Sequence, residues 1–287
     1  MVLGVGARGQ ALTFLRRLLA NRSVVVGGTL VLIVLAAALF ADVLAPHDPL
    51  RNNVRARLQG PGAVYWLGTD HFGRDILSRI LHGARLSMTI GLFVVLATGV
   101  FGTLIGAIAG YFRRLDNLIM RLMDAFMAFP AILLAITVAA VLGASVTNVV
   151  IALAVATTPH TARIVRASVL VIREMEYVEA ARALGASDLR ILFRHVLINA
   201  LAPLIVRLTY VFAIAILAEA VLSFIGVGPP PPTPSFGNII ANGRDYIAQA
   251  PWVTVFPGLA IVIAVLGLNL LGDGLRDVLD PRLRIQQ

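Results

Sequence analysis

The sequence contains no lysine and no cysteine, and each absence excludes a class of function. All 24 basic residues are arginines. A P-loop needs a lysine on the nucleotide phosphates and a Schiff-base enzyme needs a lysine amine, so neither a standard ATP site nor that chemistry fits this chain. The absence of cysteine removes thiol catalysis, disulfides and cysteine-ligated metals.

Charged residues are also scarce. They make up 14% of the chain, hydrophobic residues make up 59%, and the mean hydropathy is +0.88. Soluble domains carry about 25% charged residues, so this chain has too little polar surface for a water-soluble fold and is predicted to be a membrane protein. The net charge of +9 is attributed to arginines at the cytoplasmic ends of membrane spans rather than to a nucleic-acid surface.

Six apolar segments approach the length of about 20 residues that a spanning helix needs. They cover residues 24–44, 86–110, 122–143, 146–161, 202–227 and 252–271. Pro130 is predicted to kink the third span, and Asp124 is predicted to pair with Arg121 on the same helix face. The first segment is interpreted as a retained helix, because its apolar run exceeds the length of about 15 residues typical of a signal peptide. We predict an all-α, polytopic membrane protein with six transmembrane helices.

The arginine distribution predicts the orientation of these helices. With the N-terminus in the cytoplasm, 16 arginines lie in cytoplasmic segments and 7 lie outside, as the positive-inside rule requires. Both termini are then cytoplasmic. The predicted organisation is a cytoplasmic segment 1–23, a first helix 24–44, an extracytoplasmic loop 45–85, a five-helix core 86–275 with a cytoplasmic loop at 162–200, and a cytoplasmic tail 276–287.

The cytoplasmic loop contains the stretch EYVEAARALGASDLRILFRHVLINALAP, residues 176–203. Residues 163–184 hold no proline or glycine and predict one continuous helix. Gly185 is predicted to end this helix with a positive φ. Ser187 is a suitable N-cap for a second helix, with Asp188 at its positive end and a length reaching about Ile198. The segment therefore predicts a helix, a sharp turn and a second helix outside the membrane.

Small side chains surround this turn and would let another protein approach the backbone closely. They are Ala180, Ala181, Ala183 and Ala186. Glu179 and Arg182 flank them at helical spacing, so the segment has the features of a docking surface. The alternative interpretation is an amphipathic loop helix that packs only on its own bundle.

The pattern Glu179-Ala180-Ala181, three residues, then Gly185 resembles the EAA loop of permease subunits in bacterial ABC importers. The whole 176–203 run resembles the C-type permease of the dipeptide, oligopeptide and nickel branch. Three further stretches are similar to that branch: LGTDHFGRDILSRILHGARLSMTIGL (67–92), EAVLSFIGVG (219–228) and LGDGLRDVLDPRLR (271–284). One departure is that Ile198 follows Leu197, where the family usually has a leucine-proline pair.

The resemblance implies a type I importer permease fold, with this chain as half of a pore for di- or oligopeptides in the bacterial plasma membrane. It implies four kinds of partner: a second homologous permease subunit, two ATPase subunits that bind ATP and magnesium, an extracytoplasmic substrate-binding protein, and the lipid bilayer. The chain itself would bind no cofactor and catalyse no reaction. The implied ATPase-coupling residues within 176–198 are Glu179, Ala180, Ala181, Arg182, Gly185 and Asp188.

Glu219 is the most prominent polar residue predicted within a span, and a charge at the bilayer centre costs on the order of 3 kcal/mol. It either lines a pathway or bonds another helix. Gly226 and the proline run at 229–232 indicate that it lies close to the outer surface, which favours the second role. Gly102 and Gly106 have the spacing of a tight helix contact. The five histidines lack metal-ligand spacing, although a nickel substrate would make His47 and His71 candidate ligands.

Three alternatives to a peptide importer follow from these observations. The first is an importer permease of the same family for nickel or glutathione-like substrates. The second is a secondary transporter driven by an ion gradient, which typically shows inverted repeats that this sequence does not display. The third is a membrane-embedded scaffold or receptor. Co-purification with an ATPase through residues 176–198 would distinguish the first from the others.

Overall fold

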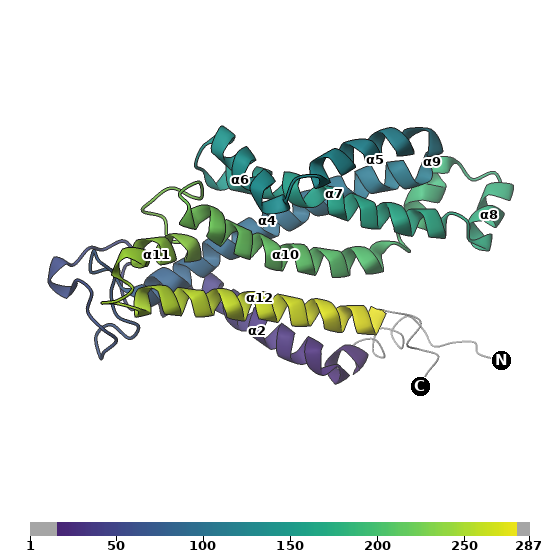
Figure 1. Cartoon of the computed structure of the whole chain (residues 1–287). Helices are drawn as coiled ribbons and strands as arrows, with labels where there is room; N and C mark the ends of the chain where they lie inside the picture. The colour runs from purple at the N-terminus through teal and green to yellow at the C-terminus, as the bar shows by residue number, and fades with distance from the viewer. Residues whose placement is uncertain (1–15, 280–287) are drawn as a thin grey trace.

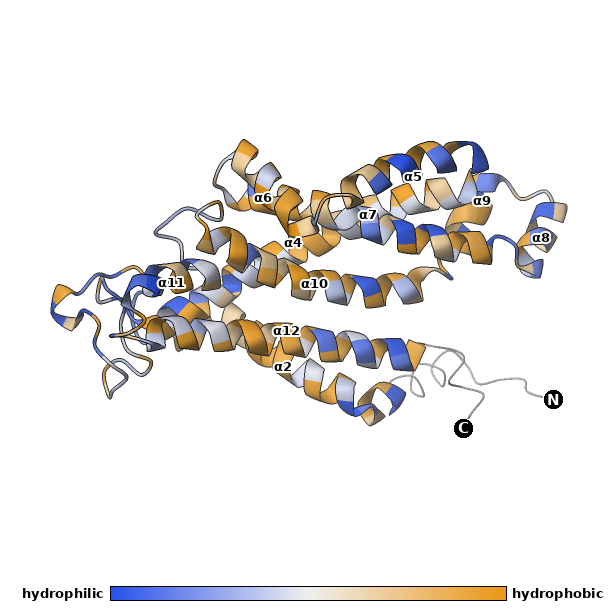
Figure 2. Ribbon diagram, in the orientation of Figure 1, coloured by the Kyte–Doolittle hydropathy of each residue, from blue (hydrophilic) through white to orange (hydrophobic). Residues whose placement is uncertain are grey.

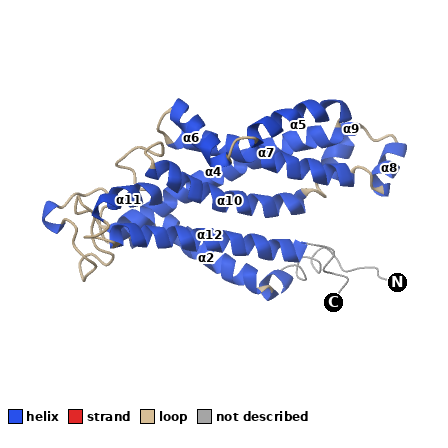
Figure 3. Ribbon diagram, in the orientation of Figure 1, coloured by secondary structure: helices blue, strands red, loops and turns tan. Residues whose placement is uncertain are grey.

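The computed structural model describes residues 16–279. The predicted termini before residue 16 and after residue 279 lie outside the described residues. Within the described range the chain forms helices and connecting loops and no β-strand, which confirms the all-α prediction (Figure 3).

Five helices are long and apolar enough to cross a membrane. They are α2 (Arg22–Leu39), α4 (Ile76–Tyr111), α7 (Val146–Ile172), α10 (Leu201–Phe224) and α12 (Trp252–Leu279). The predicted third span is a pair of shorter helices, α5 (Arg113–Met127) and α6 (Ala131–Leu142), bent by 86°, and it counts as a sixth crossing when the pair is taken as one broken span. The six predicted crossings therefore correspond to five single helices and one bent pair.

The bend between α5 and α6 corrects the prediction of a kinked third span. Pro130 stands at the N-cap of α6 with an extended ψ of 129°. Proline has no N–H to continue a helix, and it disfavours the helical conformation of the residue before it. The segment consequently breaks into two helices instead of bending within one.

Other element boundaries also differ from the predictions. Helix α4 begins at Ile76, inside the predicted loop 45–85, because the side chain of Asp75 accepts a hydrogen bond from the Ser78 backbone N–H and caps the helix. The first span ends at Leu39 and is followed by the short helix α3 (Ala41–Leu44). The fourth continues eleven residues beyond 161, to Ile172.

The helices share one long direction, and the two ends of the molecule are different (Figure 1). The loop that precedes α4 and helix α11 (Phe236–Gly243) lie at one end. Helices α8 (Glu176–Ala183) and α9 (Asp188–Ile191) lie at the other, together with the start of α2 and the end of α12. Hydrophobic residues dominate α6 and α10, whereas hydrophilic residues gather on α8 and on the nearby part of α5 (Figure 2).

Helices α4 and α7 pack along most of their lengths through a stripe of glycines. A Cβ atom added at Gly106 would overlap the carbonyl oxygen of Ala162, and one at Gly102 would lie 2.8 Å from Thr161 Cγ2. The predicted tight contact at Gly102 and Gly106 is confirmed. The small residues let the two backbones approach closely, as in other membrane helix pairs.

Replacing Gly106 with alanine is expected to destabilise the detergent-solubilised protein by about 1–3 kcal/mol, the usual range for overpacking. The added methyl group must push α4 away from a backbone atom of α7, which cannot rotate aside. Thermal unfolding followed by tryptophan fluorescence measures the change. Gly258→Ala on α12 is the matched control, because no atom lies within 4 Å of a Cβ there. Equal unfolding midpoints for the two variants would refute this account of the contact.

Candidate functional site

The segment 176–198 folds into two short helices and a π-helical turn at one end of the molecule (Figure 1). Helix α8 is separated from α7 by residues 173–175, so the predicted continuous helix 163–184 is wrong. At the break, the guanidinium of Arg173 donates a hydrogen bond of 2.7 Å to the carbonyl of Gly110 near the end of α4. Met175 then takes an extended conformation and starts α8 in a new direction.

Gly185 has a φ of +80°, which confirms the predicted turn. Its N–H bonds the carbonyl of Arg182, and the N–H of Ala186 bonds the carbonyl of Ala181. These two hydrogen bonds satisfy carbonyls at the end of α8, as in the common glycine-terminated helix end. A Cβ at Gly185 would meet no atom within 4 Å, so a larger residue there would be disfavoured by backbone strain alone.

The second helix differs from its prediction. Helix α9 covers only Asp188–Ile191 and continues as a π-helical turn, η2 (Leu192–Val196). Ser187 occupies the N-cap position, but its side chain makes no capping hydrogen bond. Asp188 instead accepts a bond of 2.7 Å from the Tyr111 hydroxyl of α4. The chain then passes through a turn at residues 197–200, where Ile198 follows Leu197, into α10.

The two short helices are fixed to the bundle by a small apolar core. Val178, Ile191 and Val196 are fully buried, and they pack in a cluster that includes Val169 of α7 and Leu204 of α10. Residues of α8, α9 and η2 thus pack directly on two membrane helices.

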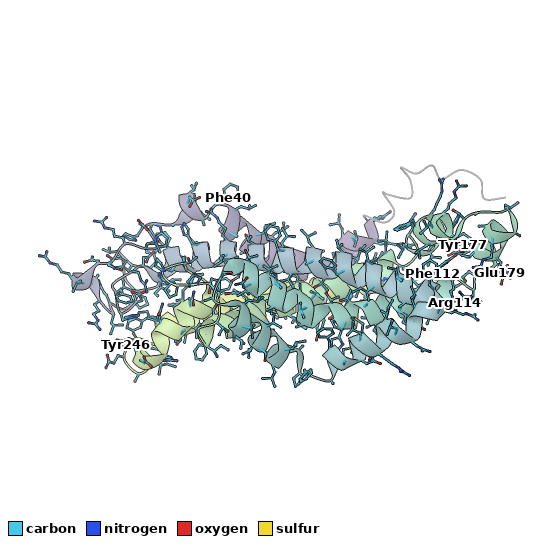
Figure 4. The ribbon with its side chains drawn as sticks, turned by 90° about the horizontal axis from the view of Figure 1, so that it is seen from above. Phe40, Phe112, Arg114, Tyr177, Glu179 and Tyr246 are labelled. Carbon is cyan, nitrogen blue, oxygen red and sulfur yellow. The ribbon has the colours of Figure 1, made fainter. Side chains whose placement is uncertain are left out.

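The outward side of this segment is open to solvent. The predicted coupling residues Glu179, Ala180, Arg182, Gly185 and Asp188 are exposed, and Ala181 is half-buried. Figure 4 shows Glu179 at the extreme end of the molecule, opposite Tyr246.

Large apolar side chains accompany these residues: Leu184 is 89% exposed, Leu189 63% and Phe193 55%. Exposed apolar groups beside small residues and charges are typical of a surface that a partner covers.

Ion pairs between α5 and α7 stand close to this end. Asp124 pairs with Arg163 and not with Arg121, which corrects the predicted local pair. Asp116 receives two hydrogen bonds from Arg166, of 2.5 and 2.6 Å. Helical spacing made Arg121 the expected partner, but the packing of α5 against α7 brings an arginine from another helix closer.

Glu219 lies on α10 and is completely buried. Its carboxylate accepts hydrogen bonds from the hydroxyls of Ser87 on α4, at 2.8 Å, and Ser223, at 2.6 Å. Ser235, which caps α11, in turn donates to Ser223. The carboxylate thus connects three helices in this structure.

The family of the chain is decided by two matches. Residues 102–285 match the model of the binding-protein-dependent transport system inner membrane component. The chain belongs to this family. Residues 10–61 of this permease match a second model, the N-terminal transmembrane domain of oligopeptide transport permease C, which agrees with the resemblance to a C-type permease.

Named relatives cover nearly the whole permease. A putative peptide transport system permease of Brucella suis is 55% identical over 94% of this chain and 92% of its own. A dipeptide transport permease of Alkalihalophilus pseudofirmus is 45% identical over 94% and 89%. A glutathione transport permease of Pectobacterium atrosepticum is 44% identical over 94% and 91%.

The methionine ABC transporter MetNI, solved in an inward-facing conformation, matches with a TM-score of 0.58 and 21% identity. The match covers 70% of this chain and 96% of the MetNI chain. The fold is therefore that of a type I importer permease.

A cluster of buried charges at the end opposite α8 was missed by the sequence reasoning. Asp70, Arg74 and Arg79 are each at most 6% exposed. The available signal was the density of charges in TDHFGRDILSR, a stretch that the sequence analysis assigns to the outer loop and to the resemblance with the permease branch. In residues 16–279, no three histidine or acidic side chains are placed to hold a metal ion.

Proposed function

We propose that this permease is the C-type subunit of an ATP-driven peptide importer and forms half of its pore with a second homologous permease subunit. An extracytoplasmic binding protein delivers di- or oligopeptides. Two separate ATPase subunits bind ATP and magnesium, since this chain has no lysine for a P-loop. The observation that carries the proposal is the solvent-exposed turn of α8 and α9 anchored on α7 and α10, together with the family membership.

In this mechanism the turn is the contact with the ATPase subunits. Glu179 offers an exposed carboxylate to a basic group, and Leu184 and Leu189 offer apolar area that docking removes from water. Ala180 and Gly185 allow the partner to approach the backbone. Movement of the ATPase pair then reaches the pore because α7 is a single helix of 27 residues that runs from the docking end to the other side.

Peptides are the favoured substrate class because the named relatives are peptide and dipeptide permeases. Glutathione, itself a modified tripeptide, is the second candidate, since one relative is named for it. Family membership argues against an ion-driven transporter and against a scaffold without transport. Reconstitution into vesicles tests the function: labelled dipeptide uptake should require ATP, both permease subunits, the ATPase subunits and the binding protein together. Uptake by this chain alone would contradict the half-pore assignment.

The orientation gives a separate prediction, with α8 and both termini on the cytoplasmic side of the bacterial plasma membrane. The chain has no cysteine, so single introduced cysteines report unambiguously. Ala180→Cys should react with a membrane-impermeant maleimide only after the cells are opened. Val64→Cys is the matched control: it is 61% exposed in the loop at the other end, and it should react in intact cells. Labelling of position 180 in intact cells would show that α8 lies outside the cell and that the proposed orientation is wrong.

A further inference from the structure

A cavity of about 500 Å³ opens at the end of the molecule opposite Glu179, where Tyr246 lies (Figure 4). It forms where the segment around residues 71–79 meets the loop after α10 and helix α11. The side-chain amide of Asn238 donates hydrogen bonds to the carbonyls of Pro229, at 3.0 Å, and Thr233, at 3.2 Å. These bonds fix the proline-rich wall, so the cavity is a formed feature of the fold.

Two buried arginines line this cavity and share a single carboxylate. Arg74 and Arg79 are 6% and 1% exposed. The Nε of Arg74 donates to Asp70 Oδ2 at 2.7 Å, and the Nε of Arg79 lies 3.8 Å from the same oxygen. Asp70 is the only acidic partner of either guanidinium in the part of the chain that the structure describes. These three side chains therefore carry one excess positive charge, which burial disfavours unless a further anion is present. The next buried carboxylate, Asp75, is engaged by Ser78 and His47, and the Nη1 of Arg79 donates to the Pro49 carbonyl at 3.2 Å.

Three residues that line this cavity carry buried polar atoms without partners. Within residues 16–279, Arg74 Nη2, Arg79 Nε and His71 Nδ1 are buried and make no hydrogen bond. A guanidinium cannot give up its proton, so its unpaired N–H groups remain donors. Burial lowers the pKa of the His71 imidazole, and the neighbouring arginines add to this effect against the opposing charge of Asp70. His71 is thus neutral at neutral pH, and the excess charge resides on the arginines.

We propose that this cavity binds the terminal carboxylate of the incoming peptide, with Arg74 and Arg79 as its charged partners. A carboxylate neutralises the excess charge and satisfies guanidinium donors in the geometry that such groups prefer. The cavity volume lies within the range of about 300–1,000 Å³ typical of small-ligand sites. A small carboxylate can enter a cavity of this volume and approach the arginines that line it, whereas a docking protein contacts exposed groups. This inference rests on the proposed peptide import and identifies the part of the substrate that is recognised.

The test uses the complex of both permease subunits with the ATPase subunits in nanodiscs, without the binding protein. The complex is incubated with an equimolar library of di- and tripeptides, half of which carry a C-terminal amide. Mass spectrometry of the retained peptides measures the ratio of free acids to amides. The wild-type complex should retain free acids roughly tenfold over amides, as expected for the loss of a charge-assisted hydrogen bond.

Two variants of the same ion pair separate an anion site from a structural pair. Arg74→Gln removes the excess positive charge and should abolish the preference for free acids. Asp70→Asn increases the positive charge and should preserve or strengthen it; its side-chain oxygen can still accept the bonds from the Phe72 and Arg74 backbone N–H groups. If both variants lose the preference equally, the pair is only structural and the proposal is wrong.

The remaining outcomes are also decisive. Uptake is measured on the same preparations after the binding protein is added. If the wild-type complex takes up peptide normally but retains acids and amides equally, the carboxylate site is wrong and the import function stands. If the wild-type complex takes up no peptide, both the import function and the carboxylate site are overturned. If Arg74→Gln weakens retention of the binding protein without peptide, the carboxylate belongs to that protein, and the proposal is overturned.

Discussion

Substituting Gly185 with valine is expected to reduce ATP-driven uptake roughly tenfold or more, a typical loss for a residue at the centre of an interface. Gly185 has a φ of +80°, a conformation in which a branched side chain is strained by about 1 kcal/mol or more. The turn would relax into another conformation and move Glu179 and Leu189 away from their docking positions. Uptake and ATP hydrolysis by the reconstituted complex, normalised to assembled subunits, measure the effect.

Gly226 supplies a matched control for the strain itself. It has a φ of +87°, no atom within 4 Å of an added Cβ, and the same pair of helix-ending hydrogen bonds, but it lies at the other end of the permease. Gly226→Val should lower the unfolding midpoint as much as Gly185→Val, yet only Gly185→Val should lose ATPase subunits during purification. If both variants retain the ATPase subunits equally, the turn at Gly185 is not part of the contact with the ATPase.

Glu179→Ala examines the charge in the same contact. This residue is exposed and lies outside the membrane spans, so its truncation should leave protein abundance unchanged while uptake falls. ATP hydrolysis should no longer depend on the loaded binding protein. If both Glu179→Ala and Gly185→Val keep wild-type coupled uptake, residues 176–198 are only a solvated loop and do not couple the ATPase to the pore.

The sequence predicted those parts of the fold that depend on local chemistry. The apolar lengths located the crossings, and the lone glycine after ARAL located the turn at Gly185 because few other residues accept a positive φ. The EAA pattern predicted which segment of the permease is exposed at one end of the bundle. Each of these features is determined by a few adjacent residues and needs no knowledge of distant contacts.

The features that the sequence could not predict depend on distant partners. The break after α7 involves the bond from Arg173 to Gly110, 63 residues earlier. Asp124 pairs with Arg163, 39 residues away, and not with its helical neighbour. For the site, the turn was predictable, but the partner of Glu219 was not, since Ser87 is 132 residues distant. Contacts of this kind follow from packing, which the local pattern does not contain.

Glu219→Ala is expected to destabilise the permease by about 3–5 kcal/mol, the range for a large buried side chain that leaves hydrogen-bonding partners unsatisfied. Removing it leaves the hydroxyls of Ser87 and Ser223 without their acceptor and opens a void between α4 and α10. Thermal unfolding of the solubilised protein measures the loss.

Glu219→Gln distinguishes a hydrogen-bonding role from a charged one. Glutamine has nearly the same shape, its amide oxygen can accept one serine hydroxyl, and its NH₂ group can donate to the other, because a hydroxyl also accepts. If Glu219 serves to connect α10 with α4 and α11, the glutamine variant should keep both the wild-type unfolding midpoint and wild-type uptake. A stable Glu219→Gln permease that no longer transports peptide would instead show that the carboxylate acts in the pathway, and the connecting role would be wrong.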